Sequence, residues 1–350
     1  MLLRLFLPLI LIVLVVASPA VAQRNAIQVG NMIAHPGEVV SGTIPIPAAK
    51  DSGTELPITI VHGAKPGPVL ALIAGNHGYE YPPILALLRL RESLNPEKLS
   101  GSVIMVHVAN MPSFLGRTIY YGPIDGKNMN RVYPGRKDGT TSERIAHVIT
   151  TEVIEQSDYL LDLHSGDGNE DLRPYIYMPV TGDEKMDRAI RKIAMALGFD
   201  HIVIDRMEPT DPMASVYCST TGITRGKPSI TVESGYLGTT DDESTTRIVD
   251  GVQSLMRHLQ MLDGDPTPVQ NPVFLEPTEV LRSPATGLLF PHVKRGRSVA
   301  KGTPIATVTD FFGDEIAEIR APFAGIVLYV VATPPISKDE PVGMIGAIKP

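Results

Sequence analysis

The sequence predicts an α/β fold, in which a mostly parallel or mixed sheet carries helices on both faces, followed by a small all-β domain. Between Pro68 and Thr246, short apolar runs alternate with stretches of helical periodicity. After Leu262 the chain becomes Pro-rich and polar, and no helical pattern follows. Strands that alternate with helices are typical of a largely parallel sheet, whose ligands gather at the carboxyl ends of its strands.

Each element of the first domain follows from a local pattern. Short continuous apolar runs predict buried strands over residues 69–74, 103–108, 159–163, 202–204 and 230–232. Apolar residues at helical spacing predict helices over residues 84–94, 142–154, 184–197 and 244–262. Residues 23–55 are expected to form peripheral strands. The predicted catalytic domain therefore runs over residues 23–262.

The carboxyl-terminal part contains an internal repeat. A linker is predicted over residues 263–278 and a β domain over residues 279–350, where the segment 283–289 matches 321–327. Two copies of one strand-and-turn unit imply a small sandwich with near twofold symmetry. This half-repeat resembles the biotinyl/lipoyl carrier fold. The corresponding hairpin tip, residues 310–314, has no acceptor lysine, so we expect a wall or lid without carrier chemistry.

The first residues resemble a secretory signal. An apolar run over residues 5–17 follows Arg4 and leads to Ala20-Val21-Ala22. This pattern predicts a signal peptide over residues 1–22, cleaved after Ala22, and hence a secreted or periplasmic protein without stable membrane insertion after cleavage. An uncleaved anchor is the alternative, although the run is short for a spanning helix. The only cysteine, Cys218, cannot form an intramolecular disulfide.

Charge and composition exclude some classes of partner. The formal net charge is −7 at pH 7, and loss of Arg4 with the signal makes it one unit more negative. No long run of one sign occurs, so the sequence carries no nucleic-acid footprint. The sequence does not decide between a monomer and a homo-oligomer. The remaining partner that we expect is a small-molecule carboxylate substrate.

Three ordered fragments carry the candidate chemistry, each at the end of a predicted strand. They are Gly-Asn-His-Gly-Tyr-Glu at 75–80, Asp-Leu-His-Ser-Gly at 162–166 and Thr-Val-Glu-Ser-Gly at 231–235. Together they offer two imidazoles and one carboxylate as ligands, with Glu233 as a spare carboxylate. A catalytic zinc site needs this set, which is three protein ligands, an open fourth position and a nearby base.

The order of these fragments resembles a known family. Gly-x-His-Gly-x-Glu, then Asn-x-Asn-Arg, then Asp-x-His-x-Gly, then Val-Glu-Ser-Gly is similar to the succinylglutamate desuccinylase and aspartoacylase family of the zinc carboxypeptidase clan. The resemblance covers residues 59–248. It implies a zinc carboxypeptidase-like fold, and family members also carry a trailing β domain.

The resemblance implies a role for each matching residue. It implies one Zn²⁺ per chain, held by three ligands: His77, Glu80 and His164. Glu233 would be the general base that takes a proton from the attacking water. Asn130 and Arg131 would bind the carboxylate of the substrate, and Arg117 would steady the oxyanion. A planar guanidinium suits both carboxylates and developing negative charge.

One position departs from the family pattern. Relatives usually carry an aspartate where this chain has Asn128, and that carboxylate accepts a hydrogen bond from a zinc histidine. Asn128 can accept the bond through its carbonyl oxygen but adds no charge to raise the basicity of the ligand. Asp162, two residues before His164 and so on the same strand face, is expected to compensate.

These observations predict a zinc-dependent hydrolase that cleaves the acyl–amide bond of an N-acyl amino acid or a similar small carboxylate. A zinc carboxypeptidase acting on peptides, including cell-wall peptides, would share the metal, the base and the Asn-Arg pair. It would need a groove that the β domain leaves open. A non-catalytic binding protein is the second alternative, although all three predicted ligands and Glu233 are present.

Overall fold

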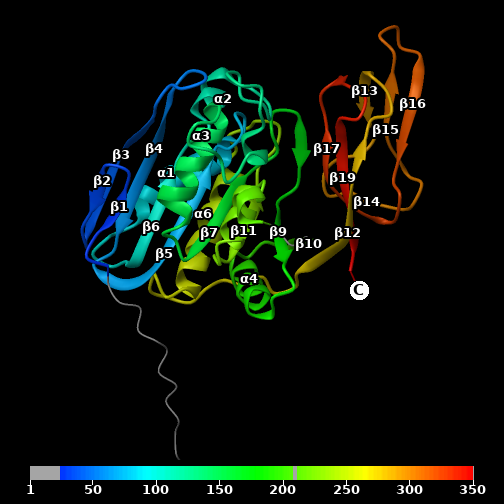
Figure 1. Cartoon of the computed structure of the whole chain (residues 1–350). Coiled ribbons are helices and arrows are strands. Elements are labelled where there is room, and N and C mark those ends of the chain that lie inside the picture. Colours follow the sequence, from blue (N-terminus) through cyan, green and yellow to red (C-terminus); the bar gives the residue numbers. More distant parts are fainter. Residues whose placement is uncertain (1–23, 208–210, 350) are drawn as a thin grey trace, which may run out of the picture.

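The computed structural model describes residues 24–207 and 211–349, so the predicted signal peptide at residues 1–22 lies outside the described part. A sheet of 13 strands crosses the whole molecule (Figure 1). A four-stranded sheet packs at its carboxyl-terminal end, and a two-stranded ribbon lies near the start of the described chain. Within the described ranges, no helix has both the length and the apolar character needed to span a bilayer.

The elements up to residue 258 alternate between strands and helices. The strands are β1 (Ile27–Val29), β2 (Met32–Ala34), β3 (Glu38–Ile46), β4 (Thr54–His62), β5 (Lys65–Ala74), β6 (Ser100–Val106), β7 (Tyr159–His164), β8 (Glu170–Leu172), β9 (Tyr175–Val180), β10 (His201–Arg206) and β11 (Ser229–Glu233). The helices are α1 (Tyr81–Ser93), α2 (Met111–Gly116), α3 (Thr141–Val148), α4 (Glu184–Ala196), α5 (Cys218–Ile223) and α6 (Asp242–His258). Shorter helical turns are η1 (Met129–Arg131), η2 (Ile149–Ile154) and η3 (Pro212–Ala214).

Every described element after α6 is a strand. These strands are β12 (Val273–Arg282), β13 (Gly287–Pro291), β14 (Ser298–Val299), β15 (Pro304–Thr309), β16 (Glu315–Arg320), β17 (Gly325–Val331), β18 (Pro335–Ile336) and β19 (Pro341–Ile348).

The large sheet is mixed, as predicted. Its order is β14-β17-β19-β12-β10-β9-β11-β7-β5-β6-β4-β3, with β8 paired to β17. The central run β11-β7-β5-β6 is parallel. The pairs β3–β4, β4–β6 and β9–β11 are antiparallel. The carboxyl ends of four neighbouring parallel strands therefore meet at one edge, where an α/β sheet places its ligands.

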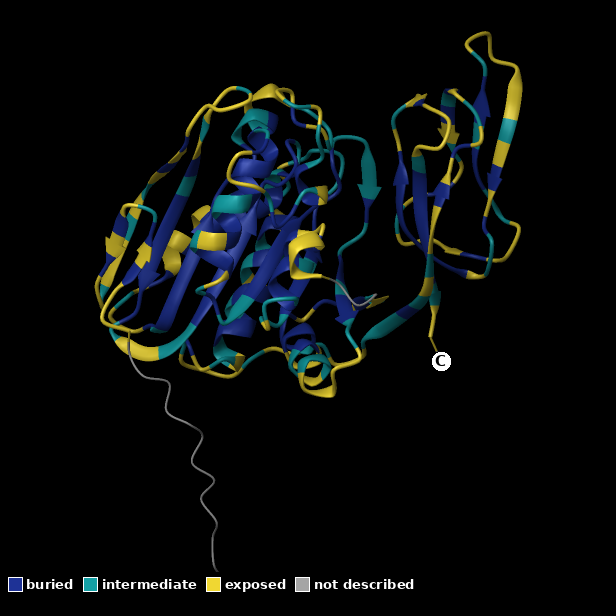
Figure 2. Ribbon diagram, in the orientation of Figure 1, coloured by how far each residue is buried: buried dark blue, intermediate teal, exposed yellow. Residues whose placement is uncertain are grey.

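Helices cover both faces of the sheet. Alternate residues of β5 point to opposite faces: Leu70 and Leu72 pack into a core that includes α1, α4 and α6. Val69 and Ala71 pack into a second core that includes α3 and Cys218 of α5. Figure 2 shows the central strands as buried between these layers. A strand buried on both faces must be apolar throughout, which is why residues 69–74 predict a strand by composition alone.

Most predicted boundaries differ from the structure by a few residues, and three elements show how. The strand predicted over 103–108 is β6, which begins at Ser100 and ends at Val106. The helix predicted over 142–154 is α3 continued by the π-helical turn η2. The helix predicted over 244–262 begins earlier, because Asp241 caps it by accepting from the Ser244 N–H. It ends at His258, two residues before Gln260, whose φ of 59° is left-handed.

The carboxyl-terminal strands continue the large sheet. The first residues of β12 pair with β10 and its later residues pair with β19. The linker predicted over 263–278 therefore overlaps β12, which begins at Val273. Because one strand serves both parts, the two share a continuous ladder of backbone hydrogen bonds.

The internal repeat corresponds to a symmetric pattern of pairing. The repeated segments place β13 and β17 at equivalent positions, and each begins at the repeated glycine, Gly287 or Gly325. β18 pairs with β13, and β14 pairs with β17. Each short strand lies in the sheet of the opposite half, so the two halves interlock and bury one core.

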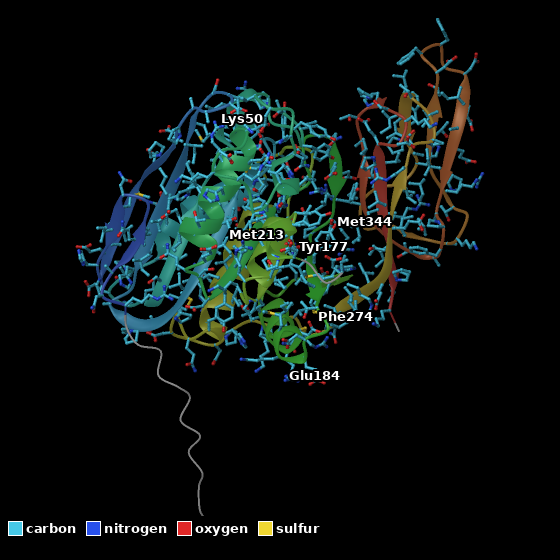
Figure 3. All side chains as sticks on the ribbon, in the orientation of Figure 1. Lys50, Tyr177, Glu184, Met213, Phe274 and Met344 are labelled. Carbon is cyan, nitrogen blue, oxygen red and sulfur yellow. The ribbon has the colours of Figure 1, made fainter. Side chains whose placement is uncertain are left out.

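Side chains pack across the boundary between the elements up to residue 258 and the carboxyl-terminal strands. The strand β8 pairs with β17, so that Leu172 lies opposite Tyr329. The Tyr177 hydroxyl lies 3.7 Å from the Met344 sulfur, and both residues are labelled in Figure 3. Leu172, Tyr329 and Met344 belong to one buried cluster, against which Tyr177 packs. The carboxyl-terminal strands therefore form a wall of the first part.

Candidate active site

The three sequence fragments meet at one edge of the sheet. His77 and Glu80 lie in the loop between β5 and α1, and His164 is the last residue of β7. Glu233 is the last residue of β11 and pairs in register with His164. Because β5, β7 and β11 are adjacent parallel strands, residues that end them in the sequence become neighbours in space.

The loop after β5 is shaped by local chemistry. Gly75 has a φ of 73°, and a Cβ there would lie 3.1 Å from the Cα of Val108, so glycine suits both the turn and the close approach. Proline at the start of α1 favours the first helical turn. Glu80 stands at the N-cap position, but its side chain makes no capping hydrogen bond. Its carboxylate is directed toward the histidines instead.

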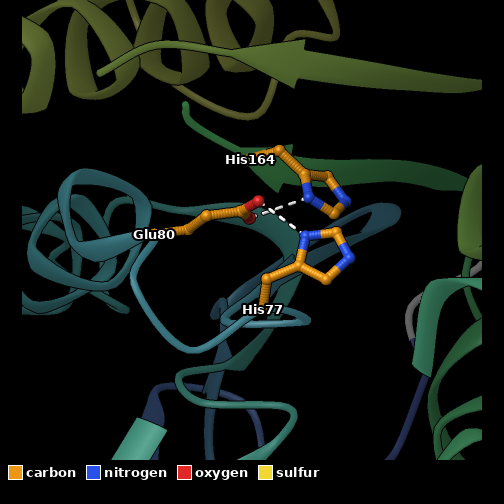
Figure 4. A group of neighbouring side chains, drawn as sticks. All are labelled: His77, Glu80 and His164. Atoms are coloured by element: carbon orange, nitrogen blue, oxygen red, sulfur yellow. Dashed lines mark hydrogen bonds and ion pairs between the residues drawn. The ribbon is translucent and has the colours of Figure 1, made fainter. Parts of the chain in front are cut away.

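His77, Glu80 and His164 form a compact buried cluster (Figure 4). One carboxylate oxygen of Glu80 lies 2.6 Å from Nδ1 of His77, and the other lies 2.8 Å from Nδ1 of His164. The two imidazole centroids are 5.1 Å apart. The three residues are 8%, 3% and 3% exposed. The predicted ligand set is therefore brought together, with one donor atom of each residue facing a common point.

The opposite ring nitrogens are held by two different groups. His77 Nε2 lies 3.1 Å from Oδ1 of Asn128, and His164 Nε2 lies 2.9 Å from Oδ1 of Asp162. A ring that donates its Nε2–H in this way keeps the Nδ1 lone pair available to a cation. Both positions singled out from the sequence thus lie where the prediction requires, a neutral amide behind His77 and a carboxylate behind His164.

Burial and charge shift the acid–base properties of the carboxyl groups. Although burial opposes it, the charges of His77 and His164 lower the pKa of Glu80 to about 2. Burial raises the pKa of Glu233 well above its usual range; His164 opposes this shift and the charge of Glu80 adds to it. Two carboxyl groups near one cluster therefore have pKa values moved in opposite directions, which is typical of acid–base sites.

Asp162 lies in a network of amides behind the cluster. Nδ2 of Asn76 donates to one oxygen of Asp162 at 2.7 Å, and Nδ2 of Asn130 donates to the other at 3.3 Å. Oδ1 of Asn130 accepts the backbone N–H of Cys218 at 2.8 Å. Asn130 Nδ2 also lies 3.1 Å from Nε2 of His164, so Asn130 contacts both His164 and Asp162, and its predicted contact with the substrate stays a prediction.

The two predicted arginines lie at the surface. The Nη1 of Arg131 donates to the carbonyl of Asn130 at 2.7 Å, and its guanidinium carbon lies 4.7 Å from the centre of the Tyr217 ring. Arg117 ends α2 with a left-handed φ of 50°. Its exposed side chain makes no hydrogen bond or ion pair with a described residue. The roles of both arginines, and that of Glu233, stay predictions.

The structure adds an acidic segment that was not singled out from the sequence. Asp167 is fully buried and accepts from the Tyr120 N–H at 3.2 Å. The Tyr120 hydroxyl donates to Glu170 at 2.6 Å, and the Tyr120 ring meets the His77 ring edge-on at 6.0 Å. Burial and the charge of Glu80 raise the pKa of Asp167 to about 6. The signal was present in the sequence, because both carboxylates follow His164 within six residues.

Comparison with known proteins identifies the family of this chain. The family model of the Succinylglutamate desuccinylase/Aspartoacylase catalytic domain matches residues 66–259. The chain is 32% identical over 300 residues to the N-alpha-acetyl-L-2,4-diaminobutyric acid deacetylase of Halomonas elongata. That match covers 83% of this chain and 86% of the relative.

Solved structures have the same fold. The product-bound ectoine utilization protein EutE (DoeB) of Ruegeria pomeroyi superposes with a TM-score of 0.79 at 27% identity, covering 88% of this chain and 95% of that one. A succinylglutamate desuccinylase/aspartoacylase of Rhodobacter sphaeroides superposes with a TM-score of 0.79 at 24% identity, covering 89% and 96%. This chain belongs to the succinylglutamate desuccinylase/aspartoacylase family of hydrolases.

Proposed function

We propose that this protein is a zinc-dependent amidohydrolase that removes the acyl group from a small N-acyl amino acid. The observation that carries the proposal is the buried cluster of His77, Glu80 and His164, with Glu233 in register beside His164. The relatives support the class of reaction, since one of them is a deacetylase of an N-acetylated amino acid.

The donor set suits zinc. Two imidazole nitrogens and a carboxylate are the ligands of catalytic zinc sites that keep one position open. The second ring nitrogens donate to Asn128 and Asp162, as the ligating histidines of such sites do. Zinc bound there supplies Lewis-acid polarisation of the scissile carbonyl and a water of lowered pKa.

A side chain of the protein, Glu233, transfers the proton of the attacking water. Glu233 takes a proton from the attacking water and passes it to the nitrogen of the leaving amine. Burial raises the pKa of this carboxyl, so it accepts a proton from water more readily than a solvent-exposed glutamate does. Arg117 would have to turn inward to steady the oxyanion, and Arg131 would bind the substrate carboxylate beside Tyr217.

The wall opposite the cluster supports a small substrate over a peptide. Tyr329 of β17 lies opposite Leu172 of β8, and β8 begins at Glu170. The carboxyl-terminal strands therefore lie next to the acidic segment, where an extended peptide would need an open groove. We also propose that these strands are a unit of the biotinyl/lipoyl carrier type without carrier chemistry.

The acidic segment supports a more specific substrate class. Asp167 lies near His77, and Glu170 follows it as the first residue of β8. Carboxylates at this position suit a substrate with a second, positively charged amino group. N-acetylated diamino acids such as that named for the Halomonas elongata relative have such a group.

Location is proposed from the sequence. The segment 1–22 has the pattern of a cleavable signal, so we propose a secreted or periplasmic enzyme cut after Ala22. Amino-terminal sequencing of protein recovered from the periplasm or medium tests this. An intact Met1 would contradict it.

One experiment separates the functional alternatives. The metal content of the purified protein is measured, and amine release is followed on N-acetyl-2,4-diaminobutyrate, N-succinylglutamate, N-acetylaspartate and short peptides. About one zinc per chain with release from N-acyl amino acids alone is the expected result. Release from peptides would favour the carboxypeptidase instead. A protein that binds no zinc after reconstitution and releases no amine would be the non-catalytic binding protein.

A further inference from the structure

One arginine of the carboxyl-terminal strands contacts two segments of the active site. Arg295 lies between β13 and β14, and its Nη1 donates to Oδ1 of Asp171 at 2.7 Å. Its backbone N–H donates to the second oxygen of the same carboxylate at 3.2 Å. Its guanidinium carbon lies 3.5 Å from the centre of the Tyr236 ring. Arg295 therefore joins Asp171 and Tyr236, which lie far apart in the sequence.

Both partners of Arg295 are close in sequence to groups of the proposed site. Tyr236 is three residues beyond Glu233, and Asp171 directly follows Glu170. The loop at residues 233–238 is bonded to the His164 side of the site. Gly166 N–H donates to the Gly235 carbonyl at 2.9 Å, and Leu237 N–H donates to the Glu170 carbonyl at 2.8 Å.

The backbone of this loop is unusual. Gly235, Leu237 and Gly238 all have positive φ, and the value for Leu237 is 52°. A left-handed conformation at a residue with a branched side chain is unfavourable and persists only when its surroundings hold it. A cavity of about 580 Å³ lies beside it, lined in part by Leu237, Arg295 and Val330. Close packing is therefore interrupted on this side of the loop, where the Arg295 side chain supplies the contact to Tyr236.

We propose that Arg295 is a positioning residue, which fixes the Glu233–Gly238 loop against β8 and so holds the Glu233 carboxylate in its working direction. This inference rests on the proposed hydrolase function, and it goes further by giving the carboxyl-terminal strands a part in the reaction. A planar guanidinium is required, because that group stacks on Tyr236 while its Nη1 binds the Asp171 carboxylate.

The test compares three variants of the full chain. Arg295→Ala removes both side-chain contacts but keeps the backbone N–H bond to Asp171, and Arg295→Lys keeps the charge but loses the planar face. Arg320→Ala is the matched control, because Arg320 ends β16 in the same carboxyl-terminal part and pairs with Glu318 at 2.5 Å. For each we measure kcat and KM on N-acetyl-2,4-diaminobutyrate, zinc content, and the thermal midpoint Tm.

If Arg295 sets the direction of the Glu233 carboxylate, its loss should lower kcat and leave substrate binding intact. We expect kcat to fall about tenfold in Arg295→Ala and at least threefold in Arg295→Lys, by analogy with small misplacements of catalytic groups. KM, zinc content and Tm should match those of the parent, as should all parameters of Arg320→Ala. An unchanged kcat in Arg295→Ala would overturn the proposal. An equal loss in Arg320→Ala, or a fall in kcat only in step with Tm, would overturn it too.

A second measurement does not depend on activity. Amide hydrogen exchange of the peptide covering residues 233–241 is followed in the same proteins. Exchange at this peptide should be faster in both Arg295 variants and unchanged in Arg320→Ala. If the parent protein hydrolyses nothing, the proposed function fails, and this exchange difference alone still decides whether Arg295 holds the loop. Equal exchange in all variants means that it does not.

Discussion

The strand-end cluster and the carboxyl-terminal wall are built in different ways. In the cluster, His77 and Glu80 are three residues apart and His164 ends an adjacent parallel strand. In the wall, Arg295 meets Asp171 across 124 residues of sequence, and Tyr177 meets Met344 across 167. The comparison teaches that the proposed chemistry depends on local motifs at strand ends, whereas the shape of the site depends on long-range pairing.

The largest expected effect concerns Glu233, the proposed base at the end of β11. Glu233→Gln should retain the metal yet lower kcat by on the order of 10² to 10⁴, the usual contribution of a general base. Steady-state kinetics and metal analysis of the purified variant measure both. Glu279→Gln, an exposed residue of β12, is the control. Full activity in Glu233→Gln would remove the residue from the mechanism.

A smaller effect is expected at the groups behind the histidines. Asp162→Asn should weaken zinc affinity by about 10-fold to 100-fold, as loss of such supporting carboxylates does. Asn128→Asp should strengthen it, since the substitution adds a charge where His77 Nε2 donates. Competition with a chromogenic chelator measures both constants. Identical affinities in Asp162→Asn and the parent protein would show that Asp162 does not compensate for Asn128.

The exposed guanidinium near Tyr217 should matter for only some substrates. Arg131→Ala should raise KM about tenfold for N-acyl amino acids with a free carboxylate, the effect of one lost charge-assisted hydrogen bond. The corresponding methyl esters should be hydrolysed by both proteins with similar KM. Arg136→Ala is a control, because Arg136 pairs with Glu143 instead. An equal loss on acids and esters would contradict the carboxylate role.

The smallest effect concerns the segment that carries Asn128. Glu143 accepts from Lys127, Thr140 and Arg136, and these contacts outweigh burial and lower its pKa to about 2 from 4.5. The stabilisation is therefore complete above pH 4.5 and is lost as the pH falls toward 2. Glu143→Gln should lower the free energy of unfolding by about 1 kcal/mol at pH 7. The difference from the parent should shrink at pH 3, as measured by urea unfolding.

The prediction for Glu143→Gln has a control variant and an outcome that would contradict it. Glu184→Gln removes only an exposed pair with Arg188 on α4, and such pairs contribute little. It should unfold like the parent protein at both pH values. A difference for Glu143→Gln that is the same at pH 7 and pH 3 would show that the charge of Glu143 is not the source of its stabilisation.

Local patterns were sufficient for the strands that carry the cluster, whereas β9, α2 and α5 were not predicted. Continuous apolar runs mark strands buried on both faces, as in β5 and β7, and the glycine after β5 marks the turn toward His77. Parallel strands that lie side by side bring their carboxyl ends together, so strand-end residues converge without any further information. This is why the sequence could predict that the proposed ligands and Glu233 lie together at one edge of the sheet.

The tertiary structure decided what surrounds the cluster. Pairing of β8 with β17, the ion pair of Arg295 with Asp171, and burial of Asp167 each join segments whose separation in sequence carries no local signal. It also decided that β12 belongs to both parts, because a strand's partners depend on which edge is free once the sheet has formed. The sequence by itself determined which residues are proposed for the chemistry, through periodicity and strand-end motifs. Only folding determined the wall they face, because that wall is made by contacts between distant strands.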